Sequence, residues 1–161
     1  MNILEFAMKM ELAGQIYYTE QAELNKENSL SKVFLMLAKD EAMHSKILRN
    51  KAEKLPCDLK QSESLTEAKN IFNRLGAHKD GMKQISDQLD VYRLALEKEK
   101  ESVTLYQKYL SEATDDESKK LFAYLVKQEE THYAIIDQLV VLISRPAEWV
   151  ESAEFGLREE Y

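Results

Sequence analysis

The sequence of 161 residues has few of the residues that punctuate folds rich in turns. Its two prolines and four glycines are too few for the many short strands of a β-sandwich or barrel. Its single cysteine, Cys57, excludes an internal disulfide, a four-cysteine iron site and a structural zinc knuckle. The predicted fold class is therefore all-α.

Long apolar runs and an excess of basic residues are also missing. The longest apolar run is Leu139–Ile143, whereas a membrane-spanning helix needs about 20 residues. No basic segment leading into an apolar stretch opens the sequence, so we expect no signal peptide. With 22 Lys and Arg against 29 Asp and Glu, the net charge of −7 excludes the basic footprint of a nucleic-acid binder. We expect a cytoplasmic protein with no nucleic-acid or membrane partner.

Turn and capping signals divide the chain, predicted to be a single domain over 1–161, into two antiparallel helical hairpins. The four long helices are predicted over about residues 2–26, 29–55, 86–112 and 116–144. Pro56 ends the second helix, because proline lacks the N–H that a helix interior needs. Thr114, Asp115 and Asp116 are N-cap candidates for the fourth helix.

A long crossover, about 56–85, joins the two hairpins. It contains the capping-box pattern Ser64-Leu65-Thr66-Glu67 and then Gly76, which together predict a short additional helix. The residues after Ser144, 145–161, are predicted to form a C-terminal tail, either a docked turn or a short helix.

The two hairpins repeat each other at an offset of 88 residues. The apolar stripe of each long helix, followed in steps of three and four residues, carries one glutamate near its middle. In the second and fourth helices a histidine follows three residues later, on the same side of the helix. The matching pairs are Glu11 and Glu99, Glu41 and Glu129, and His44 and His132.

These six residues are predicted to lie at one height. Each hairpin places its solitary glutamate and its Glu-x-x-His motif at equal distances from the turn, near residue 27 or residue 115. At about 1.5 Å of rise per residue, every site is about 20–25 Å from its turn. Packing the hairpins around one core therefore brings four glutamates and two histidines into one layer.

Four carboxylates in a dry layer repel each other, and an uncompensated buried ion costs on the order of several kcal/mol. Two divalent cations balance four negative charges, and oxygen and imidazole ligands suit iron or manganese better than thiol-seeking metals or calcium. A glutamate on two helices and Glu-x-x-His on two others is the di-iron bundle pattern. The alternative is a buried polar network without metal, which would leave carboxylates half satisfied.

Other residues near this layer receive weaker predictions. Gly14 and Ser102 follow the solitary glutamates by three residues, and their small side chains are predicted to leave open volume where dioxygen or peroxide could bind. Tyr18 and Tyr106 lie two turns from the glutamates and are predicted to be core residues or to support the ligands.

Over residues 1–144 the chain resembles the rubrerythrin and ferritin-like di-iron carboxylate proteins, most of all the short forms without a rubredoxin module. The resemblance rests on the helix pairs, the crossover, and Glu11, Glu41-Ala42-Met43-His44, Glu99 and Glu129-Glu130-Thr131-His132. It implies a ferritin-like four-helix bundle with a carboxylate-bridged pair of irons, oxidised by peroxide or dioxygen. It also implies a cytoplasmic protein that is often a homodimer.

The resemblance further implies roles for the ligands. Glu41 and Glu129 would bridge or chelate the irons, Glu11 and Glu99 would be terminal ligands, and His44 and His132 would each bind one iron. Ser102 stands where rubrerythrins carry an additional glutamate, so a six-ligand site is expected. With Cys57 as the only cysteine, electrons would come from a separate donor protein.

The function implied is that of an oxidoreductase that reduces peroxide or dioxygen. Iron oxidation and storage, as in ferritins, is one alternative. A helical bundle that metal stabilises without catalysis is another. Manganese or a mixed metal pair would use the same ligands.

Overall fold

The computed structural model of the protein describes residues 2–77 and 88–159, and all regular elements in this part of the chain are helices. They are α1 (Ile3–Leu24), α2 (Leu30–Ala52), α3 (Ser64–Ala77), α5 (Leu89–Glu112) and α6 (Asp116–Glu159). The prediction of an all-α fold is confirmed. No helix in the described ranges is long and apolar enough to cross a membrane.

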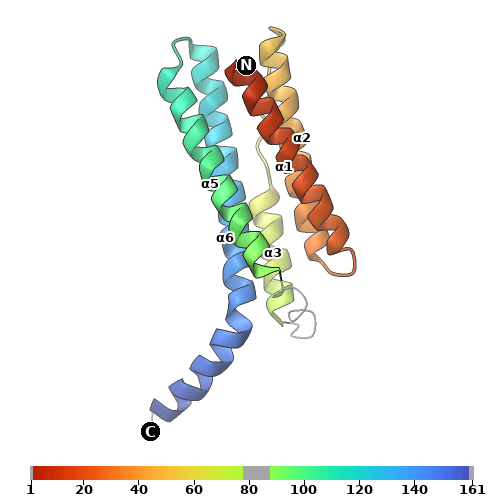
Figure 1. The fold of residues 1–161 in the computed structure, drawn as a ribbon, viewed down its shortest axis with the longest axis vertical. Helices are drawn as coiled ribbons and strands as arrows, with labels where there is room; N and C mark the ends of the chain where they lie inside the picture. Colours follow the sequence, from red (N-terminus) through yellow and green to blue (C-terminus); the bar gives the residue numbers. More distant parts are fainter. Residues whose placement is uncertain (1, 78–87, 160–161) are drawn as a thin grey trace.

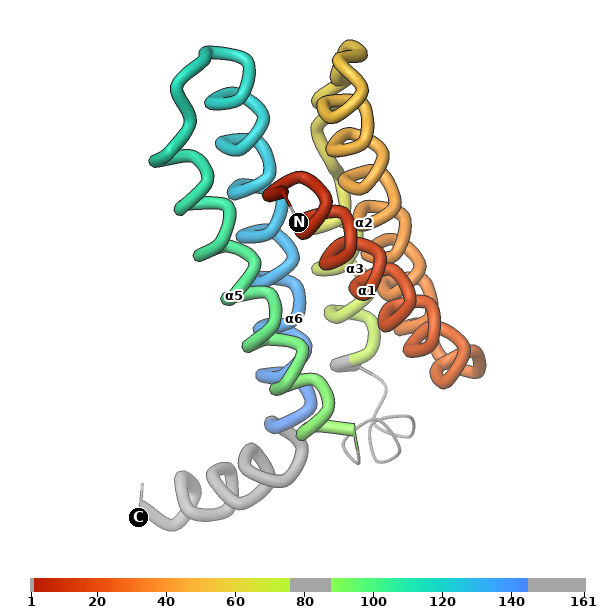
Figure 2. Tube along the Cα trace, turned by 45° about the horizontal axis from the view of Figure 1, so that its top comes forward, coloured from red at the N-terminus to blue at the C-terminus, as the bar shows by residue number. Residues whose placement is uncertain are grey.

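The four long helices form two antiparallel hairpins that lie beside each other (Figure 1). α1 packs along α2, and α5 packs along α6. α3, the helix expected in the crossover, packs against both α6 and α2. The turned view in Figure 2 keeps the same pairing of red with orange and green with blue. The arrangement is the ferritin-like helical bundle that the sequence predicted.

The helix ends follow the local signals. The Asn2 side chain accepts a hydrogen bond from the Glu5 amide at 2.8 Å and caps α1. The chain leaves α2 through Lys54, whose φ of 60° is left-handed, two residues before Pro56. Asp115 accepts from the Ser118 amide at 2.9 Å, as expected of an N-cap of α6.

Two boundaries differ from the predictions or go untested. α6 does not end at Ser144 but continues through Pro146 to Glu159, so the predicted end of the fourth long helix is wrong. A proline removes one helical hydrogen bond and clashes with the preceding turn, which can kink a helix without ending it. Residues 78–87, which include the predicted start of the third long helix, and residues 160–161 lie outside the described part.

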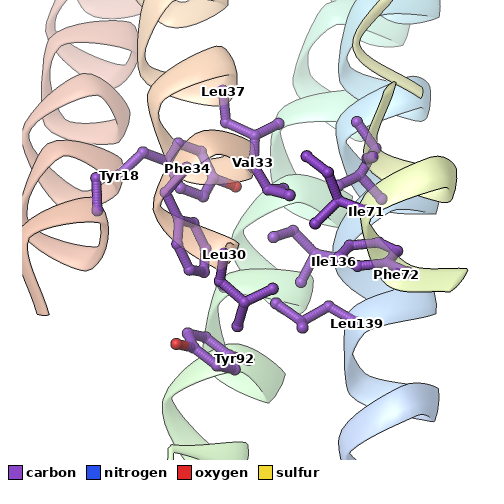
Figure 3. Packing of buried hydrophobic residues seen from close by; sticks show 14 of the residues in the cluster. Tyr18, Leu30, Val33, Phe34, Leu37, Ile71, Phe72, Tyr92, Ile136 and Leu139 are labelled. Carbon is purple, nitrogen blue, oxygen red and sulfur yellow. The ribbon is translucent and has the colours of Figure 1, made fainter. Parts of the chain in front are cut away.

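The hydrophobic core is divided into two clusters. The first lies toward the α1–α2 turn and includes Leu37 of α2 and Ile135 of α6. The second lies toward the α5–α6 turn and includes Ile47 of α2 and Val126 of α6. Figure 3 shows the first cluster, in which the side chains of α1, α2 and α5 face those of α3 and α6. Between the two clusters, the buried residues of each long helix are polar.

Candidate metal centre

All six predicted ligands lie in the layer between the two clusters. α1 contributes Glu11, α2 Glu41 and His44, α5 Glu99, and α6 Glu129 and His132. Each of them is at most 5% exposed. The structure therefore brings together every residue that the repeat and the helical spacing singled out.

The six side chains form two overlapping groups of four. One group is Glu11, Glu41, His44 and Glu129, and the other is Glu41, Glu99, Glu129 and His132. Within each group, one ligand atom from every residue lies within 4.8 Å of the others. Glu41 and Glu129 belong to both groups. Two metal ions in these positions would share the carboxylates of Glu41 and Glu129.

Both imidazole rings direct Nδ1 toward the carboxylates and Nε2 away from them. Nδ1 of His44 lies 3.3 Å from Glu11 and 3.3 Å from Glu129, and Nδ1 of His132 lies 2.7 Å from Glu41. The outer nitrogens face hydrogen-bond acceptors on the opposite hairpin, so in the neutral rings they carry the proton. Nδ1 is then the nitrogen of each ring that is free to bind a metal.

Asp40 and Gln128 are the two acceptors, and the sequence analysis missed both. Nε2 of His132 lies 3.0 Å from the carboxylate of Asp40, and Nε2 of His44 lies 3.1 Å from the amide oxygen of Gln128. Both residues are buried, and each comes directly before a shared glutamate. The 88-residue repeat also relates these two positions, and their place beside the ligands was the signal that could have found them.

Two buried tyrosines support the solitary glutamates. Tyr18 of α1 donates a hydrogen bond to Glu99, and Tyr106 of α5 donates one to Glu11 at 2.6 Å. Burial and the charges of these glutamates raise the pKa of both tyrosines well above 10, so the hydroxyls stay protonated. Both tyrosines are core residues whose hydroxyls contact predicted ligands, so they combine the two roles that the sequence predicted.

Without a metal, protons bound to the histidines and glutamates reduce the charge repulsion within the layer. Burial opposes a charge on His44, but the carboxylate of Glu11 outweighs it and raises the pKa of His44 to about 10. His132 also has a pKa well above 6.5, because the hydrogen bonds that it donates to Asp40 and Glu41 outweigh burial. Burial and the charges of neighbouring carboxylates raise the pKa of Glu41 well above 4.5. Burial, followed by the charge of Glu129, raises the pKa of Glu99 to about 7.

Two buried carboxylate oxygens accept no hydrogen bond. Among the described residues, Oε2 of Glu99 and Oε1 of Glu129 are buried and accept no hydrogen bond. Oε1 of Glu129 has an ion-pair contact with Nδ1 of His44 at 3.3 Å, whereas Oε2 of Glu99 has none within the described ranges, so burial costs both atoms hydrogen bonds that water would make. Metal coordination would satisfy both atoms, and four carboxylates with two imidazoles are ligands that iron and manganese take. The residues present therefore fit a pair of such ions.

The prediction of open volume is wrong at Gly14, and at Ser102 it stays a prediction. A Cβ added at Gly14 would lie 2.9 Å from Oε2 of Glu41, so the missing side chain makes room for a shared carboxylate. The Ser102 hydroxyl lies 3.1 Å from the carbonyl oxygen of Lys98 and 3.5 Å from the sulfur of Met10. The side chain of Glu41 thus fills the space at Gly14, whereas Ser102 is half-buried.

Gly14→Ala tests the fit of this carboxylate. The new methyl group displaces Oε2 of Glu41, so we expect metal affinity to fall by about 10-fold or more. Alanine also favours the helix by up to about 1 kcal/mol, so the metal-free protein should unfold at a similar urea concentration. Calorimetric titration with Mn²⁺ and urea unfolding measure the two effects. Ser102→Ala, at the equivalent position of α5, is the control that should leave both unchanged, and wild-type affinity in Gly14→Ala would refute the fit.

Metal binding should also release protons. The raised pKa values of His44 and His132 keep both rings charged at pH 7, and a ring must lose one proton before Nδ1 binds a cation. We expect about two or more protons released per two Mn²⁺ bound, and an affinity that falls as the pH falls. Titrations in buffers of different ionisation enthalpy measure the release, and an identical heat in all buffers would contradict it.

Comparison with known proteins identifies the family. A family model described as Rubrerythrin matches residues 2–140. Neither the curated proteins nor the solved structures contain a significant match to the chain. The matched residues cover most of the chain and include both hairpins and all six clustered side chains. On the family match and the geometry together, the chain belongs to the rubrerythrin family.

Proposed function

We propose that the protein is a non-haem di-iron oxidoreductase that reduces peroxide with electrons from a separate donor protein. The observation that carries the proposal is the pair of overlapping ligand groups that share Glu41 and Glu129. A single metal ion would use only one of these groups. Membership of the rubrerythrin family supports iron as the metal.

In this proposal Glu11 and His44 hold one ion, Glu99 and His132 hold the other, and Glu41 and Glu129 hold both. Two iron ions bound there would supply two electrons, the number that reduces one hydrogen peroxide, with two protons, to two waters. Manganese takes the same ligands and is the alternative metal. Elemental analysis of the isolated protein distinguishes the two.

The chain itself would prepare the site in three ways. The hydrophobic clusters on either side keep bulk water from the carboxylates, which strengthens their attraction for cations. Tyr18 and Tyr106 orient the terminal glutamates through hydroxyls that stay protonated. Asp40 and Gln128 fix the imidazole rings with Nδ1 facing inward.

The cysteine content of the sequence supports a separate electron donor. Cysteine-ligated iron, a common carrier of single electrons, takes four thiolates. Cys57 is the only cysteine of the sequence, and its sulfur lies 3.6 Å from the carbonyl oxygen of Ile47. The proposal therefore places the electron-supplying group on another protein.

An anaerobic titration with Fe²⁺, followed by mixing with peroxide or dioxygen, tests the proposal. We expect saturation at about two irons per chain. Near-ultraviolet absorbance should then show rapid oxidation by peroxide and slow oxidation by dioxygen. Rapid oxidation by dioxygen with uptake beyond two irons would instead indicate iron oxidation and storage. Absence of saturable binding would rule out the metal centre.

Glu129→Gln is the sharpest variant for the same assay. It removes the charge of a shared ligand while keeping its shape, so iron affinity should fall about 10-fold or more, and peroxide-driven oxidation with it. Glu130→Gln removes the same charge from the exposed neighbouring residue and is the matched control. Full iron content and full peroxide turnover in Glu129→Gln would show that the ligand assignment is wrong.

A further inference from the structure

The two histidines face chemically different partners. The outer N–H of His132 donates to the carboxylate of Asp40 at 3.0 Å, whereas that of His44 donates to the amide oxygen of Gln128 at 3.1 Å. Asp40 and Gln128 hold equivalent positions of the two hairpins, 88 residues apart. One pair of equivalent positions thus carries a negative charge in one half of the centre and none in the other.

Other contacts of the ligands do not distinguish the halves in this way. Each solitary glutamate accepts a hydrogen bond from a tyrosine of the opposite hairpin, Tyr18 or Tyr106. The shared glutamates are common to both groups of ligands. The group that accepts the outer imidazole N–H therefore differs between the halves. It acts directly on how strongly the histidine of that half binds a metal ion.

The crossover reinforces the charged half. Ser64, the first residue of α3, donates to Oδ2 of Asp40 at 2.9 Å, and the Ser62 hydroxyl lies 3.3 Å from the same oxygen. Hydroxyl groups and the imidazole N–H thus converge on one carboxylate oxygen, an arrangement that suits a negative charge. In the described part of the chain, the Gln128 side chain has a hydrogen bond with His44 alone.

A carboxylate that accepts the N–H of a metal-bound histidine makes the ring a stronger ligand than an amide does. The negative charge stabilises the positive charge that the ring acquires when it binds a cation. We infer that metal ions fill the centre in order, the first beside Glu99 and His132 and the second beside Glu11 and His44. Asp40 and Gln128 are then the positioning residues that set the order. The inference rests on the proposed function, because the centre must bind two ions.

An anaerobic titration with Co²⁺, monitored by calorimetry and by visible absorption, tests this order without measuring enzyme activity. The wild-type protein should bind Co²⁺ in two steps whose dissociation constants differ by about 10- to 100-fold. His132→Ala should remove the tighter step, and His44→Ala should remove the weaker one. This pair of variants assigns each step to one half of the centre.

Two further variants make the halves alike. Asp40→Asn keeps the shape of the side chain but removes its charge, so the tighter step should weaken by about 10- to 100-fold and approach the other. Gln128→Asp adds the missing charge, so the weaker step should tighten by a similar factor. A variant that merely damages the fold would not bind metal more tightly. Tighter binding in Gln128→Asp therefore distinguishes a positioning role of residue 128 from a merely structural one.

The outcomes separate this inference from the function on which it rests. Two Co²⁺ steps that respond as described would support both. No saturable Co²⁺ binding by the wild-type protein would overturn the proposed function and the inference together. Two bound ions whose affinities change in neither Asp40→Asn nor Gln128→Asp would overturn the order alone. Loss of the tighter step in His44→Ala would do the same.

Discussion

Four buried carboxylates at one height require positive charge, and much of the bundle is arranged to meet that requirement. Without metal, the two imidazole rings supply the charge as imidazolium ions, as the raised pKa values of His44 and His132 show. This solution is incomplete, because Glu99 and Glu129 each retain a buried oxygen without a hydrogen bond. Divalent cations would replace the protons and satisfy these oxygens together. Water cannot satisfy these oxygens instead, because the apolar clusters on either side exclude it from the layer.

The same layer joins the two halves of the fold. The hydrogen bonds of Tyr18, Tyr106, Asp40 and Gln128 with the ligands all run from one hairpin to the other. Each bond has its counterpart in the repeat, so the hairpins are held by two sets of equivalent contacts. Where the sets differ, at Asp40 and Gln128, the centre becomes unequal. The crossover adds to this difference, because among the described residues the hydroxyl of Ser64 donates a hydrogen bond to Asp40 and to no equivalent residue of the other half.

The fold and the ligands could be predicted because both depend on regular helical geometry. The 3,4 spacing and the equal distances from the turns placed Glu11 and His132 in one layer before any contact was known. Asp40 was missed because it lies off the apolar stripe, and only the packing of α2 against α6 brings it to His132. The role of Gly14 depends on a side chain of another helix, which spacing alone does not reveal. At Pro146 the local stop signal failed, because proline can be accommodated within a helix.

The central claim is that two metal ions share Glu41 and Glu129 between the hairpins. A crystal structure of the protein loaded anaerobically with Fe²⁺, with anomalous data recorded at the iron edge, tests it most directly. The account predicts two iron peaks about 3.5–4 Å apart, each bonded to Nδ1 of one histidine and both contacting the two shared carboxylates. A single peak, or peaks outside the layer of the six ligands, would contradict it.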